Sequence, residues 1–251
     1  MTKVILHGCN GAMGHVISGL AMKDEQLCIV AGVDKNTEQH YDYPVYGTLE
    51  ECPKADVIVD FSVAKATDGL LTYCSETGIP VVLCTTGLSE EQLNRVRELS
   101  GTCAVLRSAN MSLGVNLLLK MVKEAARTLA AADFDIEILE KHHNQKVDAP
   151  SGTALALADS INEALDGAYH YKYDRTAERV KRDKKEIGIQ AVRGGSIVGE
   201  HDIIFAGQDE VITFRHTAYS KAIFAKGALE AAKFLAGRKP GMYDMQDVIG
   251  Q

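Results

Sequence analysis

The sequence predicts an α/β fold in two parts: a Rossmann-like, doubly wound parallel sheet, and a second α+β domain with an open mixed sheet. Two observations carry this prediction. Short, continuously apolar segments alternate with helical stretches in the first hundred residues, whereas later segments alternate polar and apolar residues with period two. Continuous apolar strands that are each followed by a helix are typical of a parallel sheet covered on both faces.

The first part of the chain contains repeated strand–helix units. The expected strands are short apolar runs, and they cover residues 4–6, 27–33, 57–59 and 80–84. The expected helices have apolar residues at helical spacing or begin with a typical capping residue, and they lie over 13–20, over 64–77 and from 89 onward. Ligands gather at the carboxyl ends of parallel strands. The Gly, Asp, Ser and Thr residues that end these runs are therefore candidate ligand contacts.

The pattern changes after residue 112. A long helix is expected to about Ala132, followed by a strand over 134–140 whose alternation suggests one wetter face. The other expected elements are a helix over 153–165, strands over 187–192, 197–205 and 211–216, and a terminal helix over 221–235. We therefore expect one domain over 1–112 and 220–251, to which the terminal helix returns, and a second domain over 113–219.

Composition excludes several classes of protein. The chain has 27 Lys and Arg against 34 Asp and Glu, a net charge of −7, with 6% aromatic residues and no Trp. This composition argues against nucleic-acid binding, and no apolar stretch approaches the ~18 residues that span a bilayer. The segment 172–186 holds seven basic and four acidic residues. We interpret this segment as a solvated loop rather than a polyanion site.

Cysteine usage indicates a reduced, cytoplasmic location. All six Cys lie within the first 103 residues, at wide spacings and without a C-x-x-C pair. That pattern disfavours both a zinc ribbon and a disulfide framework.

A glycine-rich loop follows the first expected strand. Gly8, Gly11 and Gly14 have one residue more between the first two glycines than the usual G-x-G-x-x-G spacing. Such a loop turns the strand, admits a pyrophosphate and directs helix N–H groups at it, although a tight turn without a ligand is the alternative interpretation. Asp34, which ends the second strand, is placed to accept ribose hydroxyls, and Lys35 to pair with a 2′-phosphate. We expect NADH and NADPH both to be accepted, with the preference unresolved.

The segment 140–154 is the most informative part of the chain. Two His and two Lys occur within six residues, followed by Pro150-Ser151-Gly152-Thr153 at the expected start of a helix. Paired His suggests zinc, but no second cluster has metal spacing, so we expect no metal. Histidine supplies protons near neutral pH, and cations beside a helix N-terminus suit a substrate with carboxylates. A hydrogen-bonded surface loop is the alternative interpretation.

This segment, His142-His143-x-x-Lys146-x-Asp148-Ala149-Pro150-Ser151-Gly152-Thr153, resembles the signature of the 4-hydroxy-tetrahydrodipicolinate (dihydrodipicolinate) reductase family. The likeness extends over nearly the whole chain, through the glycine loop, Asn110-Met111-Ser112 and Arg193-Gly194-Gly195. It implies NAD(P)H-dependent reduction of a small dicarboxylate, with loss of water, in the diaminopimelate and lysine pathway. It also implies a homotetramer assembled through the sheet of the second domain.

The resemblance also implies roles for individual residues. His142 matches the proton donor and Lys146 the second catalytic residue, although the sequence leaves open whether His142, Lys146 or water is the immediate donor. The substrate-binding positions are matched by His143, Gly152 and Thr153. The cofactor positions are matched by Gly8, Cys9, Asn10, Gly11, Ala12, Met13, Asp34, Lys35, Cys84, Thr85, Thr86, Ser108, Ala109, Asn110 and Met111. Cys84 and Lys35 depart from the Gly and Arg that are common there.

Two other functions remain as alternatives. A dehydrogenase of the aspartate-semialdehyde or homoserine type would share the two-domain plan, but it gives no reason for the spacing of His142, His143 and Lys146. A nucleotide-sensing protein would bind the cofactor without turnover, and it gives no reason for intact His142 and Lys146.

Overall fold

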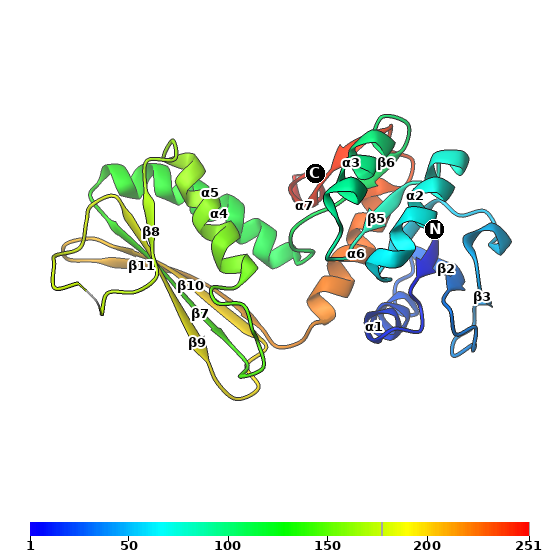
Figure 1. The fold of residues 1–251 in the computed structure, drawn as a ribbon, viewed down its shortest axis with the longest axis horizontal. Helices are drawn as coiled ribbons and strands as arrows, with labels where there is room; N and C mark the ends of the chain where they lie inside the picture. Colours follow the sequence, from blue (N-terminus) through cyan, green and yellow to red (C-terminus); the bar gives the residue numbers. More distant parts are fainter. Residues whose placement is uncertain (177, 251) are drawn as a thin grey trace. The chain divides into compact units, whose positions relative to one another are not determined.

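A seven-stranded sheet lies at the centre of the first of two compact units. The computed structural model describes residues 1–176 and 178–250; Ala177, within the segment 172–186, and Gln251, at the end of the expected first domain, lie outside the described residues. One unit comprises Met1–Ser112 and the C-terminal segment from Ala222, and the other comprises Leu113–Lys221 (Figure 1). The chain thus leaves the first unit once and returns to it at Ala222.

The sheet of the first unit is entirely parallel, in the order β12-β6-β5-β4-β1-β2-β3. Its strands are β1 (Thr2–His7), β2 (Leu27–Val33), β3 (Val45–Tyr46), β4 (Val57–Asp60), β5 (Val81–Leu83), β6 (Ala104–Leu106) and β12 (Gly241–Tyr243). Its helices are α1 (Ala12–Ala21), α2 (Ala64–Thr77), α3 (Glu90–Leu99), α6 (Ala222–Leu235) and α7 (Met245–Ile249), with a 3₁₀ turn at Leu49–Glu51. The strand order reverses between β1 and β4. Ligands of doubly wound folds bind at such a reversal.

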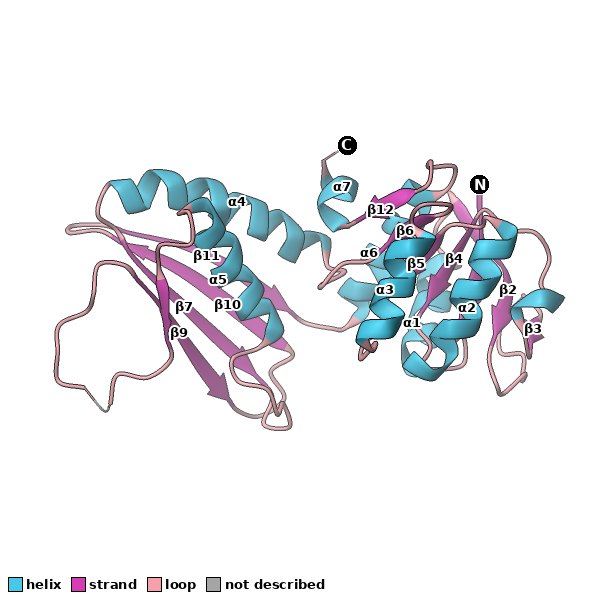
Figure 2. Cartoon of the chain, turned by 45° about the horizontal axis from the view of Figure 1, so that its top comes forward, coloured by secondary structure: helices cyan, strands magenta, loops and turns pink. Residues whose placement is uncertain are grey.

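Helices cover both faces of this sheet. Ile5, Ile58 and Leu83 pack into a buried cluster with residues of α2 and α3. α6 contacts β4 and β5, and α1 contacts β2; Figure 2 shows these helices beside the sheet. Strands with both faces covered have no water-facing side, which explains why they read as continuous apolar runs.

The second unit is a five-stranded mixed sheet in the order β11-β10-β7-β9-β8. Its strands are β7 (Asp135–His142), β8 (His170–Lys172), β9 (Glu186–Arg193), β10 (Gly199–Ala206) and β11 (Val211–Ala218), and its helices are α4 (Leu113–Ala131) and α5 (Gly152–Ala164). β7 is antiparallel to β10 and parallel to β9. Alternate residues of β7, among them Ile136 and Ile138, are buried in a cluster with α4 and α5. The predicted fold class, a Rossmann-like sheet with a second mixed sheet, is confirmed.

Elements too short to show a period escaped the sequence prediction. β3, β8 and β12 have two or three residues each, and α7 has five. Tertiary pairing rather than local pattern forms the three strands; β12, for example, pairs with β6 from far along the chain.

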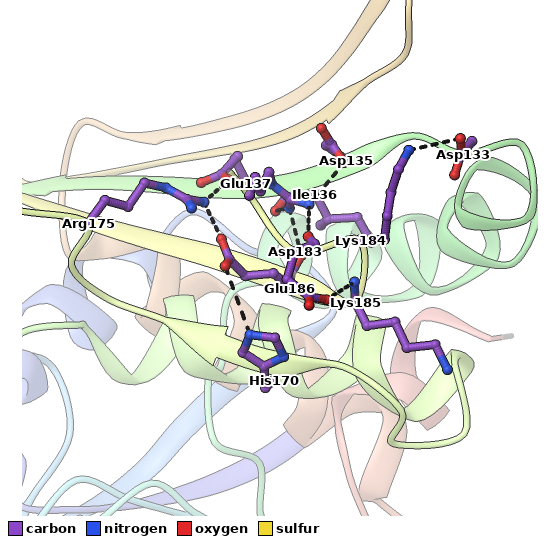
Figure 3. Close-up of polar contacts among 11 residues, drawn as sticks. Asp133, Asp135, Ile136, Glu137, His170, Arg175, Asp183, Lys184, Lys185 and Glu186 are labelled. Atoms are coloured by element: carbon purple, nitrogen blue, oxygen red, sulfur yellow. Dashed lines mark hydrogen bonds and ion pairs between the residues drawn. The ribbon is translucent and has the colours of Figure 1, made fainter. Parts of the chain in front are cut away.

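The described part of the segment 172–186 is a mostly exposed loop, as predicted, and two of its arginines also pair with the sheet. Arg182 donates to Asp135 Oδ1 at 2.9 Å, to Glu137 Oε1 at 3.1 Å and to the carbonyl oxygen of Ile136 at 2.8 Å. Arg175 pairs with Glu137 and with the buried carboxylate of Glu186 (Figure 3). The sequence did not reveal this network because the acidic partners on β7 lie some forty residues upstream. With these two arginines paired to carboxylates, the segment offers less positive charge to a polyanion than its composition suggests.

Alanine at Gly227 is expected to destabilise the chain strongly, because a Cβ built there overlaps the carbonyl oxygen of Met111. Overpacking against backbone costs about 1–3 kcal/mol or more. Alanine at Gly69, an exposed position of α2 with nothing within 4 Å of a built Cβ, is instead expected to stabilise by about 0.5–1 kcal/mol. Urea unfolding gives the change in the free energy of unfolding for each variant. Equal changes in the two variants would contradict the packing of α6 on Met111.

Candidate active site

The glycine loop between β1 and α1 leaves no room for side chains. Gly8 has φ +82°, and a Cβ there would lie 2.6 Å from the carbonyl oxygen of Phe61, which follows β4. A Cβ at Gly14 would overlap the carbonyl oxygens of Gly8 and Cys9. The loop therefore lies at the β1–β4 strand-order reversal, where main chain packs closely on main chain.

Asp34 and Asn10 join this loop to the segment after β2. The main-chain N–H of Asn10 donates to Asp34 Oδ2 at 3.1 Å, and that of Asn36 donates to Oδ1 at 3.3 Å. The side-chain amide of Asn10 donates to the carbonyl oxygens of Asn36 (2.7 Å) and Glu38 (2.9 Å). The side-chain amide N–H groups of Asn10 are thus occupied by acceptors within the protein. The half-buried carboxylate of Asp34 retains lone pairs that can accept further hydrogen bonds. Lys35 lies exposed beside it.

The two cysteines among the predicted cofactor residues have thiols with raised pKa values. Cys9 is fully buried, and its thiol lies against Gly32 and close to Tyr43 in the core. Burial and the charge of Asp34 raise the pKa of Cys9 to about 11. Burial, with Asp60 nearby, raises the pKa of Cys84 well above its ordinary value. Both thiols are therefore neutral and inert rather than nucleophilic.

The other predicted cofactor residues follow neighbouring strands. Thr85 and Thr86 come after β5, and the stretch 108–111 comes after β6. Thr85 is buried directly after β5. Met111 is also buried, and Asn110 Oδ1 accepts from the N–H of Ser112 at 2.8 Å. Parallel pairing of β1, β4, β5 and β6 brings these residues to one edge of the sheet.

A buried pair that the sequence did not assign lies at the same edge. His7 Nδ1 is 2.9 Å from Oδ1 of Asp60, and Asp60 is fully buried at the end of β4. Burial by itself would raise the pKa of Asp60, but hydrogen bonds with His7 and Ser62 outweigh it and hold the pKa below its ordinary value. Asp60 was recognisable as a strand-ending residue. Its partner was not, because His7 lies 53 residues earlier in the chain.

These features fit a dinucleotide. The N-cap of α1 is Gly11, and no side chain caps the start of this helix. The first main-chain N–H groups of α1 are therefore not occupied by a capping side chain. Glycines that admit close approach, a helix N-terminus and an acidic residue after the second strand are the parts that hold a pyrophosphate and a ribose.

In the second unit, His142 and Glu140 lie side by side on the face of β7 that packs against α5. His142 Nδ1 is 2.6 Å from Oε2 of Glu140, whose side chain is fully buried. Arg193, at the end of β9, donates to both carboxylate oxygens at 2.7 and 2.8 Å. The N–H of Ser151 donates to Oε1 at 3.0 Å. Burial by itself would raise the pKa of Glu140, but the hydrogen bonds from Arg193, His142 and Ser151 lower it below its ordinary value.

The four basic residues of the predicted cluster do not share one face. Lys141 points to the opposite side of β7 from His142, where it pairs with Glu200 at 3.0 Å and with Asp202 at 3.7 Å. The reason is the strand's period of two, which continues through His142. Lys146 and the half-buried His143 follow the strand, and Lys146 Nζ lies 2.9 Å from Oδ1 of Asp148. An ammonium has three N–H donors, so this contact does not saturate Lys146.

The start of α5 completes this group. Ser151 is the N-cap and accepts from the N–H of Ala154 at 3.2 Å, while Gly152 and Thr153 begin the helix. The Ser151 hydroxyl also lies 3.1 Å from Nε2 of His201 on β10, and the His201 and His142 rings meet edge-on with centroids 5.2 Å apart. The sequence did not assign His201, because the β7–β10 pairing that brings it here is long-range.

His201 makes stability depend on pH. Burial, with His142 nearby, lowers the pKa of His201 to about 4, against about 6.5 unfolded. The folded state therefore binds fewer protons between these values, and stability falls as pH falls through that window. Three nearby charged or titratable groups also affect the pKa of His201: Glu140 raises it, and His216 and Lys146 lower it.

Between pH 7 and pH 5, we expect the free energy of unfolding of the wild type to fall by about 2 kcal/mol more than that of His201→Gln. His170→Gln, at an exposed position, serves as the control. Urea unfolding at the two pH values measures the difference, and identical losses in wild type and His201→Gln would show that His201 is not a buried neutral residue.

Residues 1–176 and 178–250 contain no group of three or more His, Cys, Asp or Glu side chains that could hold a metal ion. In the same part of the chain, no helix is long and apolar enough to cross a membrane.

Comparison with known proteins gives consistent findings. A family model described as dihydrodipicolinate reductase, N-terminus, matches residues 2–111, and one described as dihydrodipicolinate reductase, C-terminus, matches residues 114–249. The chain is 54% identical to a 4-hydroxy-tetrahydrodipicolinate reductase of Caldanaerobacter subterraneus subsp. tengcongensis, covering 99% of this chain and 98% of the relative. It is 50% identical to the same enzyme of Clostridium novyi, with the same coverage.

A solved structure is similar over the full length. It is a dipicolinate-bound dihydrodipicolinate reductase from Paenisporosarcina sp. TG-14, with a TM-score of 0.82 and 26% identity, covering 99% of each chain. A probable dehydrogenase from Thermotoga maritima, with a TM-score of 0.60 and 12% identity, shares the fold alone.

Proposed function

The chain belongs to the dihydrodipicolinate reductase family, and from this premise we propose which of its residues carry out the reaction. The enzyme is an NAD(P)H-dependent oxidoreductase of diaminopimelate and lysine biosynthesis that converts 4-hydroxy-tetrahydrodipicolinate to tetrahydrodipicolinate with loss of water. The observation that carries the residue assignments is that the buried carboxylate of Glu140 contacts His142 and the N-cap of α5 directly. Its partner Arg193 also holds the main chain of Asp148, whose side chain pairs with Lys146.

The first unit binds NADH or NADPH. In this proposal the main chain of residues 8–13 and the N-terminus of α1 hold the pyrophosphate, Asp34 accepts the adenosine ribose hydroxyls, and Lys35 faces a 2′-phosphate. Residues 84–86 and 108–111 hold the nicotinamide end. When bound, the cofactor supplies the hydride that reduces an unsaturated carbon of the substrate.

The second unit binds the dicarboxylate and supplies the proton. One carboxylate meets the N-terminus of α5 at Gly152 and Thr153, where the helix dipole favours negative charge. The His143 side chain contacts the substrate, and the ammonium of Lys146 neutralises part of the substrate's charge. His142 and Lys146 are the proton-supplying pair. The proton goes to the atom next to the carbon that receives hydride.

Dipicolinate tests the dicarboxylate site, since the similar reductase from Paenisporosarcina is described with dipicolinate bound. Calorimetric titration is expected to show picolinate, which lacks one carboxylate, binding at least about tenfold more weakly, a loss of about 1.4 kcal/mol. Lys146→Ala is expected to weaken dipicolinate binding more than picolinate binding. Equal affinity of the wild type for the two ligands would overturn this assignment.

Both cofactors are expected to support turnover. Asp34 disfavours a 2′-phosphate whereas Lys35 favours it, so the two effects oppose each other. The ratio of kcat/KM for NADPH and NADH should stay below about a hundredfold, which is about 2.7 kcal/mol. Steady-state kinetics with each cofactor gives the ratio, and a larger preference would show that one of these two residues does not contact the ribose.

We further propose a cytoplasmic homotetramer that assembles through the uncovered face of the second unit's sheet. That face carries Lys141, Glu200, Asp202 and Arg215, which are paired within one chain. All six cysteines are free. Sedimentation equilibrium giving the mass of a single chain would contradict the assembly.

A further inference from the structure

Glu140 is a buried carboxylate whose four hydrogen bonds reach three separate elements. His142 Nδ1 approaches Oε2 at 2.6 Å, the N–H of Ser151 approaches Oε1 at 3.0 Å, and Arg193 donates to both oxygens. The side chain has no exposed surface. Burying an ion pair contributes little net stability, so stability alone does not explain why a strand interior holds this charge.

We propose that Glu140, kept ionised by Arg193, is a positioning residue that fixes the tautomer of His142 and the place of the substrate-binding turn. The inference rests on the proposed function, because it takes His142 and the start of α5 as the groups that meet the substrate.

The hydrogen-bond pattern favours the ionised form of Glu140 over the neutral acid. Arg193 and the Ser151 N–H can only donate, so each carboxylate oxygen must accept. An ionised carboxylate beside Nδ1 makes that ring nitrogen the proton carrier. Nε2 is then the His142 atom that exchanges a proton with a substrate, and the carboxylate stabilises the imidazolium form.

β10 has a glycine, Gly199, beside Nε2 of His142. A Cβ at Gly199 would lie 3.1 Å from Nε2 of His142 and 3.4 Å from its Cδ2. The two ring nitrogens thus have different surroundings: Nδ1 faces a buried acceptor, and Nε2 faces a position without a side chain.

Arg193 also connects the carboxylate of Glu140 to the loop that carries Lys146. Its Nη2 donates to the carbonyl oxygen of Asp148 at 2.6 Å, and the side chain of Asp148 pairs with Lys146. The strand that carries His142, the loop that carries Lys146 and the N-cap of α5 are therefore all tied to one Glu–Arg pair.

Glu140→Gln tests the proposal. The neutral amide presents an N–H to one of its partners, so it no longer enforces Nδ1 protonation. We expect kcat to fall about 10- to 100-fold, as for other groups that orient a functional histidine. We also expect the pH limb of kcat that reports His142 to move down by about one unit, since the imidazolium loses its carboxylate. The KM for NADPH should not change.

A matched control lies on the same strand. Glu137→Gln makes the same substitution three residues earlier on the opposite face, where Glu137 pairs with Arg175 and Arg182 (Figure 3). It is expected to lower stability without moving the pH limb. Glu140→Asp, which keeps the charge, should restore the pH limb of the wild type even where kcat recovers only in part.

Nitrogen NMR of histidine-labelled protein separates this inference from the proposed function, since it needs no turnover. The wild type and Glu140→Asp should show His142 protonated at Nδ1, and Glu140→Gln should show a shifted tautomer population. An unchanged tautomer together with an unchanged pH limb in Glu140→Gln would overturn the positioning role while leaving the reductase assignment intact. A wild type without turnover but with the Nδ1 tautomer would overturn the proposed function instead.

Discussion

Lys146→Ala is expected to lower kcat about a hundredfold or more, within the ~10²–10⁴ range for groups that transfer protons. Two losses contribute to this effect. The substrate loses a cation that neutralises a carboxylate, and the reacting atom loses one of its two proton-supplying neighbours. Lys146→Arg keeps the charge but has no proton to give near neutral pH, so we expect it to restore dicarboxylate binding more than kcat.

The control for this prediction is Lys184→Ala. Lys184 is an exposed lysine of the same unit whose ammonium pairs with Asp133 at 2.8 Å (Figure 3). Its removal should leave kcat and both KM values unchanged. Steady-state kinetics at saturating cofactor compares the variants, and a wild-type kcat for Lys146→Ala would remove Lys146 from the mechanism.

Gly14→Ala is expected to weaken NADPH and NADH binding about 10- to 100-fold. The methyl group would overlap the carbonyl oxygens of Gly8 and Cys9, so the loop that receives the pyrophosphate must shift. Overpacking against main chain costs about 1–3 kcal/mol, which corresponds to roughly this range of affinity.

Gly19→Ala is the matched control, since it lies in the same helix with nothing within 4 Å of a built Cβ. Fluorescence titration of the reduced cofactor gives the dissociation constants, and circular dichroism confirms that each variant is folded. Wild-type affinity in folded Gly14→Ala would mean that the loop does not hold the cofactor.

The sequence predicted the helices and strands that have a clear period. Residues 27–33 and 64–77 form β2 and α2 with the expected bounds, because local apolar spacing decides whether such segments become strand or helix. The two- and three-residue strands β3, β8 and β12 were missed because their hydrogen bonds come from partners elsewhere in the chain.

The candidate site was predictable where the signal was local. His142, Lys146 and Gly152 stand within eleven residues, so a short motif reveals them. Arg193 and His201 were not assigned, because only the pairing of β7 with β9 and β10 brings them to His142.

Lys141 shows the limit of counting charges in a short segment. It adjoins His142 in sequence, yet strand alternation turns it to the opposite face, where it meets Glu200 and Asp202. The cations on the His142 side are therefore fewer than the composition of the segment suggests.

Oxidation of NADPH and of NADH in the presence of freshly prepared 4-hydroxy-tetrahydrodipicolinate tests the assigned reaction most directly. The account predicts turnover with both cofactors, one equivalent of reduced nicotinamide consumed for each tetrahydrodipicolinate formed, and none with aspartate semialdehyde or homoserine. No oxidation with either cofactor in the folded enzyme would contradict the assignment.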